Sequence, residues 1–405
     1  MMEVAVGTVL LTSLLVALGG VVMGLRRLFA PARQTVILVN GTQRIEADGS
    51  GKLLGALAGA GFAIPSACAG AGTCGLCRVQ VSGAEPPLPT ERARLSRLEL
   101  RAGTRLACQV GLRRDLQVQV PAELLAASSF SCRVVSNTPL SPLIREIVLE
   151  VPEGQAFEPR AGAYVQVTAP AYRLAYADLA VDERHRAAWD KMGISGLVAS
   201  SPVAETRAYS LANRPEDVGR VVLFIRLAVP PPGVPEARPG VVSSFLFALK
   251  PGDSVDVSGP YGHFGAAGGS DREMVLIGGG VGMAPLRAII HDQLERGSGR
   301  KISFFYGARS RIDVFHAEEF DDLARRYANF SWTLALSDAA PEDHWDGPAG
   351  FVHSVVFEQL LKTHEAPEGC EYYLCGPPLM IQAVSAMLDA CGVDEESVFA
   401  DDFGS

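Results

Sequence analysis

The 405-residue chain lacks the positive charge that a nucleic-acid partner requires. Its 36 Lys and Arg residues are outnumbered by 45 Asp and Glu residues, which gives a net charge of −9, and its basic residues form no cluster. Proteins that bind nucleic acid draw much of their affinity from Lys and Arg contacts with phosphates. The composition therefore argues against nucleic acid as a partner.

Cysteine is also scarce. Eight cysteines in 405 residues are too few for a disulfide scaffold.

The sequence has no internal repeat and no low-complexity tract. With 48% apolar and 20% charged residues it can bury packed cores. Its length suits two to four domains of roughly 100–200 residues each.

Long apolar runs are absent after Arg26, but one opens the chain. Residues 4–25 form a run of 22 residues without a charge. As a helix this run spans about 33 Å, enough for a hydrocarbon core of about 30 Å. Arg26 and Arg27 follow at once, so the positive-inside rule places the remainder in the cytoplasm. A cleaved signal peptide would need positive charge before the run and a shorter apolar core. We predict a single-pass transmembrane anchor at residues 1–32.

Three regions with different patterns follow the anchor, so a multidomain protein is expected. Residues 33–126 combine short strands with a Gly- and Cys-rich loop, which indicates an α+β domain. Residues 127–268 are strand-rich, typical of an antiparallel β-barrel, and carry a charged insertion at 172–205. Residues 269–405 alternate strands and helices, which predicts an α/β domain with a parallel sheet. Helices are predicted at 51–60, 244–249, 285–296, 317–327, 355–364 and 378–390.

Four cysteines have the spacing of an iron–sulfur site. Cys68, Cys74 and Cys77 are separated by five and two residues, and Cys108 follows after 30 more. The loop reads CAGAGTCGLC, and its small residues let backbone N–H groups point at cluster sulfides. A structural zinc site usually has two paired C-x2-C segments, and only one is present here. The pattern resembles plant-type ferredoxins, although those have four residues between the first two cysteines. It implies a [2Fe–2S] cluster in a β-grasp ferredoxin domain.

A flavin motif lies where a barrel strand leaves the insertion. The tetrapeptide RAYS at 207–210 resembles the R-x-Y-S signature of the ferredoxin–NADP reductase superfamily. The Arg207 guanidinium would donate paired hydrogen bonds to the FAD pyrophosphate, and the Tyr209 ring would stack on the isoalloxazine. Ser210 would donate a hydrogen bond near the reactive flavin N5.

A second flavin contact follows at the segment GVVSS, residues 240–244. Ser243 and Ser244 open a predicted helix whose first backbone N–H groups would hold the FAD phosphate. The order and distance of the two motifs match the same superfamily.

A glycine-rich turn at 278–285 separates a predicted strand from a predicted helix. It departs from the G-x-G-x-x-G fingerprint, because Met283 or Pro285 occupies the third glycine position. Its glycines still allow a nicotinamide dinucleotide to approach closely, and Pro285 suits the first position of a helix. A tight turn without a ligand is the alternative. The glycines concerned are Gly278, Gly279, Gly280 and Gly282.

The segment CGPP at 375–378 ends the last predicted strand. In the superfamily this cysteine lies against the nicotinamide ring, so the resemblance makes Cys375 a positioning residue for hydride transfer, together with Ser210. An aromatic residue near the C-terminus covers the flavin in the superfamily, which makes Phe403 the candidate here. A frayed tail is the alternative.

Reductases of aromatic-ring and phenol oxygenases combine the same modules without a membrane helix. The anchor, the insertion and the segments GFVH (350–353), EYYLC (371–375) and DDFG (401–404) resemble instead the NADH-oxidising subunits of bacterial sodium-translocating NADH:quinone oxidoreductases. Phe245 and Leu211 depart from that family, which has Tyr and Met at these positions.

This resemblance implies the electron-input subunit of a six-subunit complex in the bacterial inner membrane, with its catalytic domains on the cytoplasmic side. A hydride passes from NADH to FAD, and single electrons then pass to the [2Fe–2S] cluster, to other subunits and to ubiquinone as Na⁺ is extruded. The anchor carries no ionisable residue, so the sodium path belongs to the partners.

Some alternatives stay open. Arg309 and Arg311 would suit the 2′-phosphate of NADPH, although the resemblance favours NADH. The chain could also be a membrane-tethered NAD(P)H reductase component of an oxygenase, or an electron-transfer adaptor with degenerate nicotinamide chemistry.

Overall fold

The computed structural model describes residues 34–401 except 63, 67, 69, 122, 123, 125–127, 232, 235, 236 and 263. The described residues form two compact units, one from residues up to 64 and 70–122, the other from 65–69 and 123 onward. The predicted anchor lies outside the described residues. Among the helices that the structure does describe, none combines the length and apolar character that a bilayer crossing demands.

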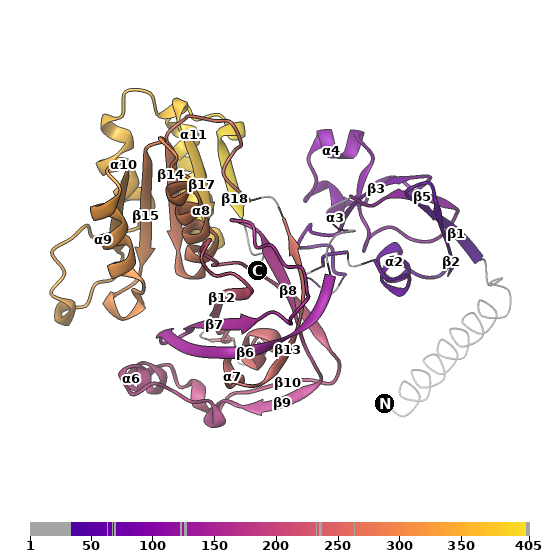
Figure 1. The fold of residues 1–405 in the computed structure, drawn as a ribbon, viewed down its shortest axis with the longest axis horizontal. Helices are drawn as coiled ribbons and strands as arrows, with labels where there is room; N and C mark the ends of the chain where they lie inside the picture. Colours follow the sequence, from indigo (N-terminus) through magenta and orange to yellow (C-terminus); the bar gives the residue numbers. More distant parts are fainter. Residues whose placement is uncertain are drawn as a thin grey trace, which may run out of the picture. The chain divides into compact units, whose positions relative to one another are not determined.

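The first unit is an α+β domain on a five-stranded mixed sheet (Figure 1). Its elements are β1 Gln34–Val39, β2 Gln43–Asp48, α2 Leu53–Gly59, β3 Arg78–Ser82, α3 Pro89–Arg92, α4 Arg97–Arg101, β4 Thr104–Leu106 and β5 Leu116–Gln119. The strand order is β2-β1-β5-β3-β4, with β1 parallel to β5 and the other pairs antiparallel. Asn40 and Gly41, both at positive φ, make the turn between β1 and β2. This is the β-grasp arrangement expected for residues 33–126.

The second unit begins with an antiparallel sheet that closes into a barrel. Its strands are β6 Ser128–Ser141, β7 Ile144–Glu150, β8 Tyr164–Ala169, β11 Glu205–Ser210, β12 Arg220–Arg226 and β13 Ser254–Tyr261. The order is β11-β8-β13-β6-β7-β12, and a bridge between Leu211 and Leu223 joins the two edges. Strand β12 is apolar on both faces because Leu223 lines the barrel core while Phe224 packs in the core of the following α/β domain.

The charged insertion is folded, which its sequence did not predict. It forms the hairpin strands β9 Tyr172–Ala175 and β10 Val198–Ser201 around helix α6 Glu183–Met192. Within α6 only His185 and Trp189 are buried, so the helix carries almost no apolar stripe. The Trp189 indole N–H donates to the Pro142 carbonyl at 2.7 Å and fixes the helix to the barrel. Helix α7, Val241–Ala248, follows β12.

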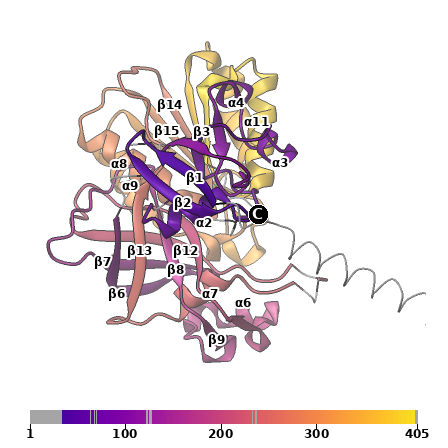
Figure 2. The same cartoon turned by 90° about the vertical axis from the view of Figure 1, so that its right-hand side faces the viewer.

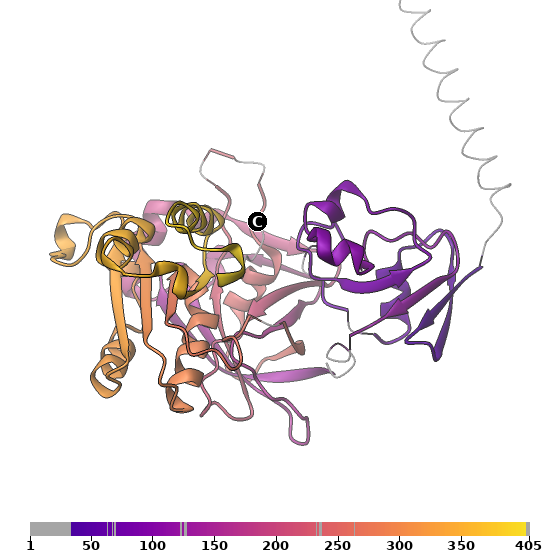
Figure 3. The same cartoon turned by 90° about the horizontal axis from the view of Figure 1, so that it is seen from above.

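The remainder is a five-stranded parallel sheet with helices on both faces (Figure 2). Its elements are β14 Met274–Gly279, α8 Met283–Glu295, β15 Ile302–Ala308, α9 Ala317–Arg326, β16 Phe330–Leu336, α10 Val352–Gln359, β17 Glu371–Cys375, α11 Pro378–Ala390 and β18 Val398–Asp401. The order is β16-β15-β14-β17-β18. Helices α8 and α9 share a core with one face, and α10 and α11 share a core with the other. Figure 3 shows this sheet and its helices from above.

Several predicted boundaries were wrong. Helix α8 begins at Met283, so Pro285 is its third residue rather than its first; its missing N–H is still harmless within the first turn. Helix α7 begins at Val241, three residues before the predicted start. Helix α10 ends at Gln359, because a separate 3-10 turn, Leu361–Thr363, follows it. Residues 398–401 form the edge strand β18, which the sequence did not predict.

Candidate functional site

Three of the four predicted cluster cysteines lie together in the first unit. A hydrogen bond with Cys108, then burial, raises the pKa of Cys77, and the Cys74 thiol adds to the effect. The hydrogen bond from Cys77, opposed by burial and assisted by the Gln109 amide, lowers the pKa of Cys108 to about 6. The pair therefore favours one thiolate, the form that binds iron. Cys68 is partly buried in the short segment grouped with the second unit.

The loop around these cysteines has the backbone that only glycine adopts readily. Gly70, Gly72 and Gly75 have φ of 87°, 80° and 69°. A Cβ on Gly72 would lie 2.7 Å from the Gln109 side-chain nitrogen. That nitrogen donates to the Gly70 carbonyl at 3.0 Å and to the Cys108 sulfur at 3.4 Å. A close-fitting loop of glycines and thiols suits the predicted cluster.

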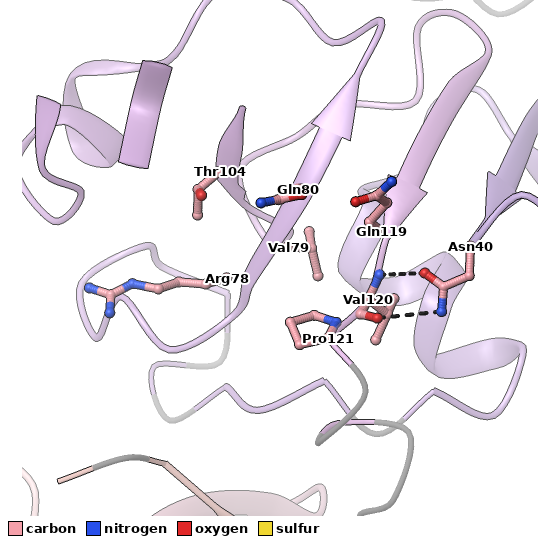
Figure 4. A pocket seen from close by; sticks show the side chains of 8 residues that line it. All are labelled: Asn40, Arg78, Val79, Gln80, Thr104, Gln119, Val120 and Pro121. Carbon is pink, nitrogen blue, oxygen red and sulfur yellow. Dashed lines mark hydrogen bonds between the residues drawn. The ribbon is translucent and has the colours of Figure 1, made fainter. Parts of the chain in front are cut away.

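The first unit also has a surface hollow of about 550 Å³, and none of these cysteines lines it (Figure 4). Asn40 forms one wall, where its amide accepts from the Val120 N–H at 2.8 Å. Arg78 and Gln80 of β3 line another part. The hollow contains none of the predicted site residues.

In the barrel, the RAYS motif occupies most of strand β11. Arg207 pairs with Glu205 at 2.9 Å and donates to the Thr206 carbonyl at 2.8 Å. Tyr209 is partly exposed and packs against the barrel core. Ser210 is buried, and its hydroxyl donates to the Asp401 carboxylate at 3.1 Å.

Sequence reasoning missed Gln166, a buried residue of β8 opposite Ala208. Directly paired residues of an antiparallel ladder share a face, and residues two apart do so as well. Gln166 and Ser210 therefore lie on the same face. The Gln166 amide nitrogen has no hydrogen-bond partner among the described residues. An unsatisfied buried donor beside the flavin motif fits a bound cofactor with acceptor atoms. No spacing rule singles out one glutamine in a strand, so the sequence carried no signal for it.

The start of helix α7 is held by the two predicted serines. Ser244 is fully buried, and its hydroxyl bonds to the Tyr176 hydroxyl at 2.7 Å and to the Gly240 carbonyl. Ser243 accepts from the Ala228 N–H at 3.2 Å. Gly240, the N-cap residue, has no side chain that could cap the helix. These serines fix the helix start, and its first-turn backbone N–H groups are the natural phosphate donors.

The glycine turn and the CGPP segment are in direct contact. Gly278 is the last residue of β14 that pairs with β17, and its partner there is Cys375. A Cβ on Gly282 would lie 2.0 Å from the Cys375 carbonyl oxygen, whereas one on Gly280 would meet nothing within 4 Å. A Cβ on Gly279 would lie 3.0 Å from the Met380 sulfur. The close approach of the Cys375 carbonyl therefore requires glycine at position 282, as expected for a dinucleotide turn.

Asp401 connects the barrel to the α/β domain within the second unit. Cys375 is buried at the carboxyl end of β17, and its register partner on β18 is Asp401. The same aspartate accepts the hydrogen bond from Ser210. The structure thus brings Ser210 and Cys375 to one place through a residue that the sequence did not single out. Phe403 lies outside the described residues.

A buried charge cluster holds the barrel and the α/β domain together. Arg287 of α8 donates to the Ala212 carbonyl at 2.8 Å, two residues after Ser210, and to both oxygens of Glu319. Burial alone would raise the pKa of Glu319, but His291 and Arg287 hold it well below its usual value. The barrel is thereby fastened to α8 close to Ser210.

The side chains of the two arginines beyond β15 both have hydrogen-bond partners. Arg309 contacts the Asp338 carboxylate at 3.1 Å through two nitrogens. Arg311 donates to the Asp343 carbonyl at 2.8 Å through its guanidinium, and its backbone N–H donates to the Asp343 carboxylate at 3.2 Å. The charge of Arg309 is therefore partly compensated, whereas the Arg311 guanidinium meets a backbone carbonyl.

Comparison with protein families assigns a class to this arrangement. The 2Fe-2S iron-sulfur cluster binding domain matches residues 37–113, the oxidoreductase FAD-binding domain matches 197–265, and the oxidoreductase NAD-binding domain matches 276–386. The chain is an oxidoreductase that joins a [2Fe–2S] ferredoxin domain to FAD- and NAD-binding domains.

Relatives that match over the full length define the family. The F subunit of the Na(+)-translocating NADH-quinone reductase of Neisseria meningitidis (serogroup C, serotype 2a) is 46% identical over 405 residues and covers 100% of both chains. The protein of the same name from Klebsiella pneumoniae is 44% identical over 407 residues, again with 100% coverage of both. The chain belongs to the family of F subunits of Na(+)-translocating NADH-quinone reductases.

Solved structures share the fold at lower identity. The Amycolatopsis cytochrome P450 reductase GcoB has a TM-score of 0.62 and 26% identity, covering 91% of this chain and 98% of its own. The ferredoxin reductase of carbazole 1,9a-dioxygenase has a TM-score of 0.58 and 24% identity, covering 92% and 98%.

Proposed function

We propose that this chain is the electron-input subunit of a sodium-translocating NADH:quinone oxidoreductase. Bound FAD would supply an acceptor for the hydride of NADH and a one-electron donor for the [2Fe–2S] cluster. The observation that carries the proposal is the meeting of Ser210 with Asp401, beside Cys375, because it joins the flavin motif to the nicotinamide motif. Ser210 would orient the flavin and Cys375 the nicotinamide ring. With FAD bound, the Ser210 hydroxyl would turn its hydrogen from Asp401 to the flavin.

The cofactors would be held by separate sets of residues. Cys68, Cys74, Cys77 and Cys108 would ligate the cluster. FAD would be held by Arg207, Tyr209, Gln166, the start of α7 at Ser243 and Ser244, and Phe403. The nicotinamide dinucleotide would be held by Gly278, Gly279, Gly280, Gly282, Pro285 and Cys375.

NADH is the proposed electron donor in preference to NADPH. Because the Arg309 guanidinium already contacts the Asp338 carboxylate and that of Arg311 contacts the Asp343 carbonyl, a 2′-phosphate would have to displace both partners. A steady-state comparison of kcat/KM for the two nucleotides tests this. A preference for NADPH would contradict it.

Assembly at the membrane completes the proposal. Residues 1–32 would form a single-pass anchor in the bacterial inner membrane, with the domains at 33–126, 127–268 and 269–405 on the cytoplasmic side. The partners would be the other members of a six-subunit complex, and electrons would reach ubiquinone through them. The sodium path would lie in those partners.

The detergent-solubilised full chain, loaded with FAD and iron–sulfur cluster, tests both parts. We expect it to oxidise NADH with an artificial acceptor, and to co-purify with flavin-carrying membrane proteins of its host. Absence of NADH turnover would leave only an adaptor role. Recovery of a soluble hydroxylase would instead favour an oxygenase reductase.

A further inference from the structure

A second cluster of ligand-type side chains lies at the amino ends of the central parallel strands. Glu273 directly precedes β14, Cys370 directly precedes β17, and His364 follows the 3-10 turn after α10. One ligand atom from each lies within 4.8 Å of the others. Cys375 stands at the other end of β17, five residues or roughly 17 Å away, so this cluster is separate from the nicotinamide site.

The spacing of the three atoms matches a tetrahedral metal site. The His364 Nε2 lies 3.3 Å from the Glu273 Oε2 and 3.6 Å from the Cys370 Sγ. Zinc–ligand bonds of about 2.0–2.1 Å to N or O and 2.3 Å to S, set at tetrahedral angles, separate N from O by about 3.3 Å and S from N by about 3.6 Å. Two of the three separations are therefore already those of bound zinc.

The carboxylate is oriented by groups around it. Lys301 contacts the Glu273 Oε1 at 3.0 Å, and the Ser303 hydroxyl donates to the same oxygen at 3.4 Å. Oε2 is thereby turned toward His364. Outer contacts of this kind commonly fix the direction of a metal ligand.

The histidine is oriented as well. The Ala366 N–H donates to the His364 Nδ1 at 3.2 Å, so in the neutral ring Nε2 carries the hydrogen. That hydrogen points between the carboxylate and the sulfur, at the place a metal ion would take. On metal binding the imidazole hydrogen moves to Nδ1 and the Cys370 proton leaves to solvent. Metal–ligand bonds then replace the hydrogen bonds of Nε2 with Glu273 and Cys370, and the exposed hydrogen bond from Ala366 is lost.

We propose that Glu273, His364 and Cys370 bind one Zn²⁺ ion, with water as the fourth ligand. The mixture of thiolate, imidazole and carboxylate selects zinc over magnesium or calcium. Cys370 is buried, while His364 and Glu273 keep 20% and 15% of their side chains exposed, which leaves an entry path for the ion. The ion would tie the connection after α10 to the starts of β14 and β17. The alternative is a hydrogen-bonded trio that binds no metal.

The test uses the full chain carrying FAD and its cluster. After dialysis against Zn²⁺, we expect one zinc per chain by elemental analysis, unchanged iron content, and a zinc X-ray absorption spectrum with one sulfur and several N/O ligands. Zinc should also raise the thermal unfolding midpoint. Cys370→Ser and His364→Ala should each weaken zinc binding at least tenfold. Cys391→Ser and His353→Ala, which alter a cysteine and a histidine outside the cluster, should leave it unchanged.

Three results would overturn the site. The first is absence of saturable zinc binding. The second is equal zinc affinity in wild type, Cys370→Ser and His364→Ala. The third is zinc coordinated by sulfur alone with loss of iron, which would place the metal on the cluster cysteines. His364 is partly exposed, so its variant remains informative if Cys370→Ser does not fold.

Discussion

The Ser210 hydroxyl is buried and donates its single hydrogen to the Asp401 carboxylate. With FAD bound, this hydrogen would turn to the flavin, so we expect Ser210→Ala to slow flavin reduction by NADH by about 100-fold, the effect of removing one aligned donor at a reacting centre. FAD content should not change. Stopped-flow bleaching of the flavin measures the rate. Ser200→Ala, an exposed serine of β10, is the matched control. A wild-type rate in Ser210→Ala would remove this residue from the reaction.

Glycine at 282 is a steric requirement, whereas glycine at 280 is only a conformational preference. Gly282→Ala would place a methyl group 2.0 Å from the Cys375 carbonyl, and the backbone must move. We expect a loss of more than about 3 kcal/mol in the free energy of unfolding. Gly280→Ala meets no atom and should cost only about 1–2 kcal/mol, for its φ of +57°. Denaturant unfolding of both variants compares the two. Equal losses would contradict the close contact.

At the scale of elements, α3 is fastened to β4 by one buried ion pair. Glu91 is fully buried and accepts two hydrogen bonds from Arg105, at 2.8 and 2.7 Å. The Leu106 N–H donates to the same carboxylate at 3.1 Å, two residues before Cys108. Glu91→Gln leaves Arg105 buried without its counter-charge, which costs about 3–5 kcal/mol. We expect faster hydrogen exchange in β4 and earlier loss of cluster absorbance in denaturant. Exchange rates equal to those of wild type would show that the pair is dispensable.

The same pair should make the first unit sensitive to acid. Burial alone would raise the pKa of Glu91, but the Arg105 guanidinium and two backbone N–H groups hold it below its usual value of 4.5. A carboxyl whose pKa is depressed by folding stabilises the protein above the unfolded pKa, and the contribution disappears as the pH falls through the folded value. Exchange protection of β4 in wild type should therefore decrease below about pH 4.5. In Glu91→Gln this decrease should be smaller, and an identical profile would contradict the assignment.

Elements with an apolar pattern were predictable, and those held by tertiary contacts were not. Helix α11 was predicted at 378–390 and has those bounds, because Pro377 and Pro378 mark its start and its apolar face extends to Leu388 near its end. Helix α6 was missed because it buries only two side chains. Strand β18 has four residues and exists through its pairing with β17. The same is true of the site. Fixed spacings locate the cysteines and the glycine turn, but no spacing predicts the contact of Asp401 with Ser210, which is 191 residues away in the sequence.

At the scale of the whole molecule, the predicted cluster cysteines and the residues proposed for hydride transfer belong largely to different units. Ser210, Cys375 and the glycine turn all lie in the second unit, whereas Cys74, Cys77 and Cys108 lie in the first. Each unit has its own sheets and its own buried core. Chemistry in the second unit should therefore not depend on an assembled cluster in the first.

Cys74→Ala separates the two steps. Loss of one thiolate removes a cluster ligand, so the visible absorbance of the cluster and most of its iron should disappear. Reduction of FAD by NADH, followed by stopped flow, should stay within about twofold of wild type because no residue of the second unit has changed. Electron delivery to a one-electron acceptor that depends on the cluster should be abolished. Cys391→Ser, which changes a cysteine outside the predicted cluster, should alter neither step. If FAD reduction fails together with the cluster in Cys74→Ala, the two units are not independent, and the hydride step requires the ferredoxin domain.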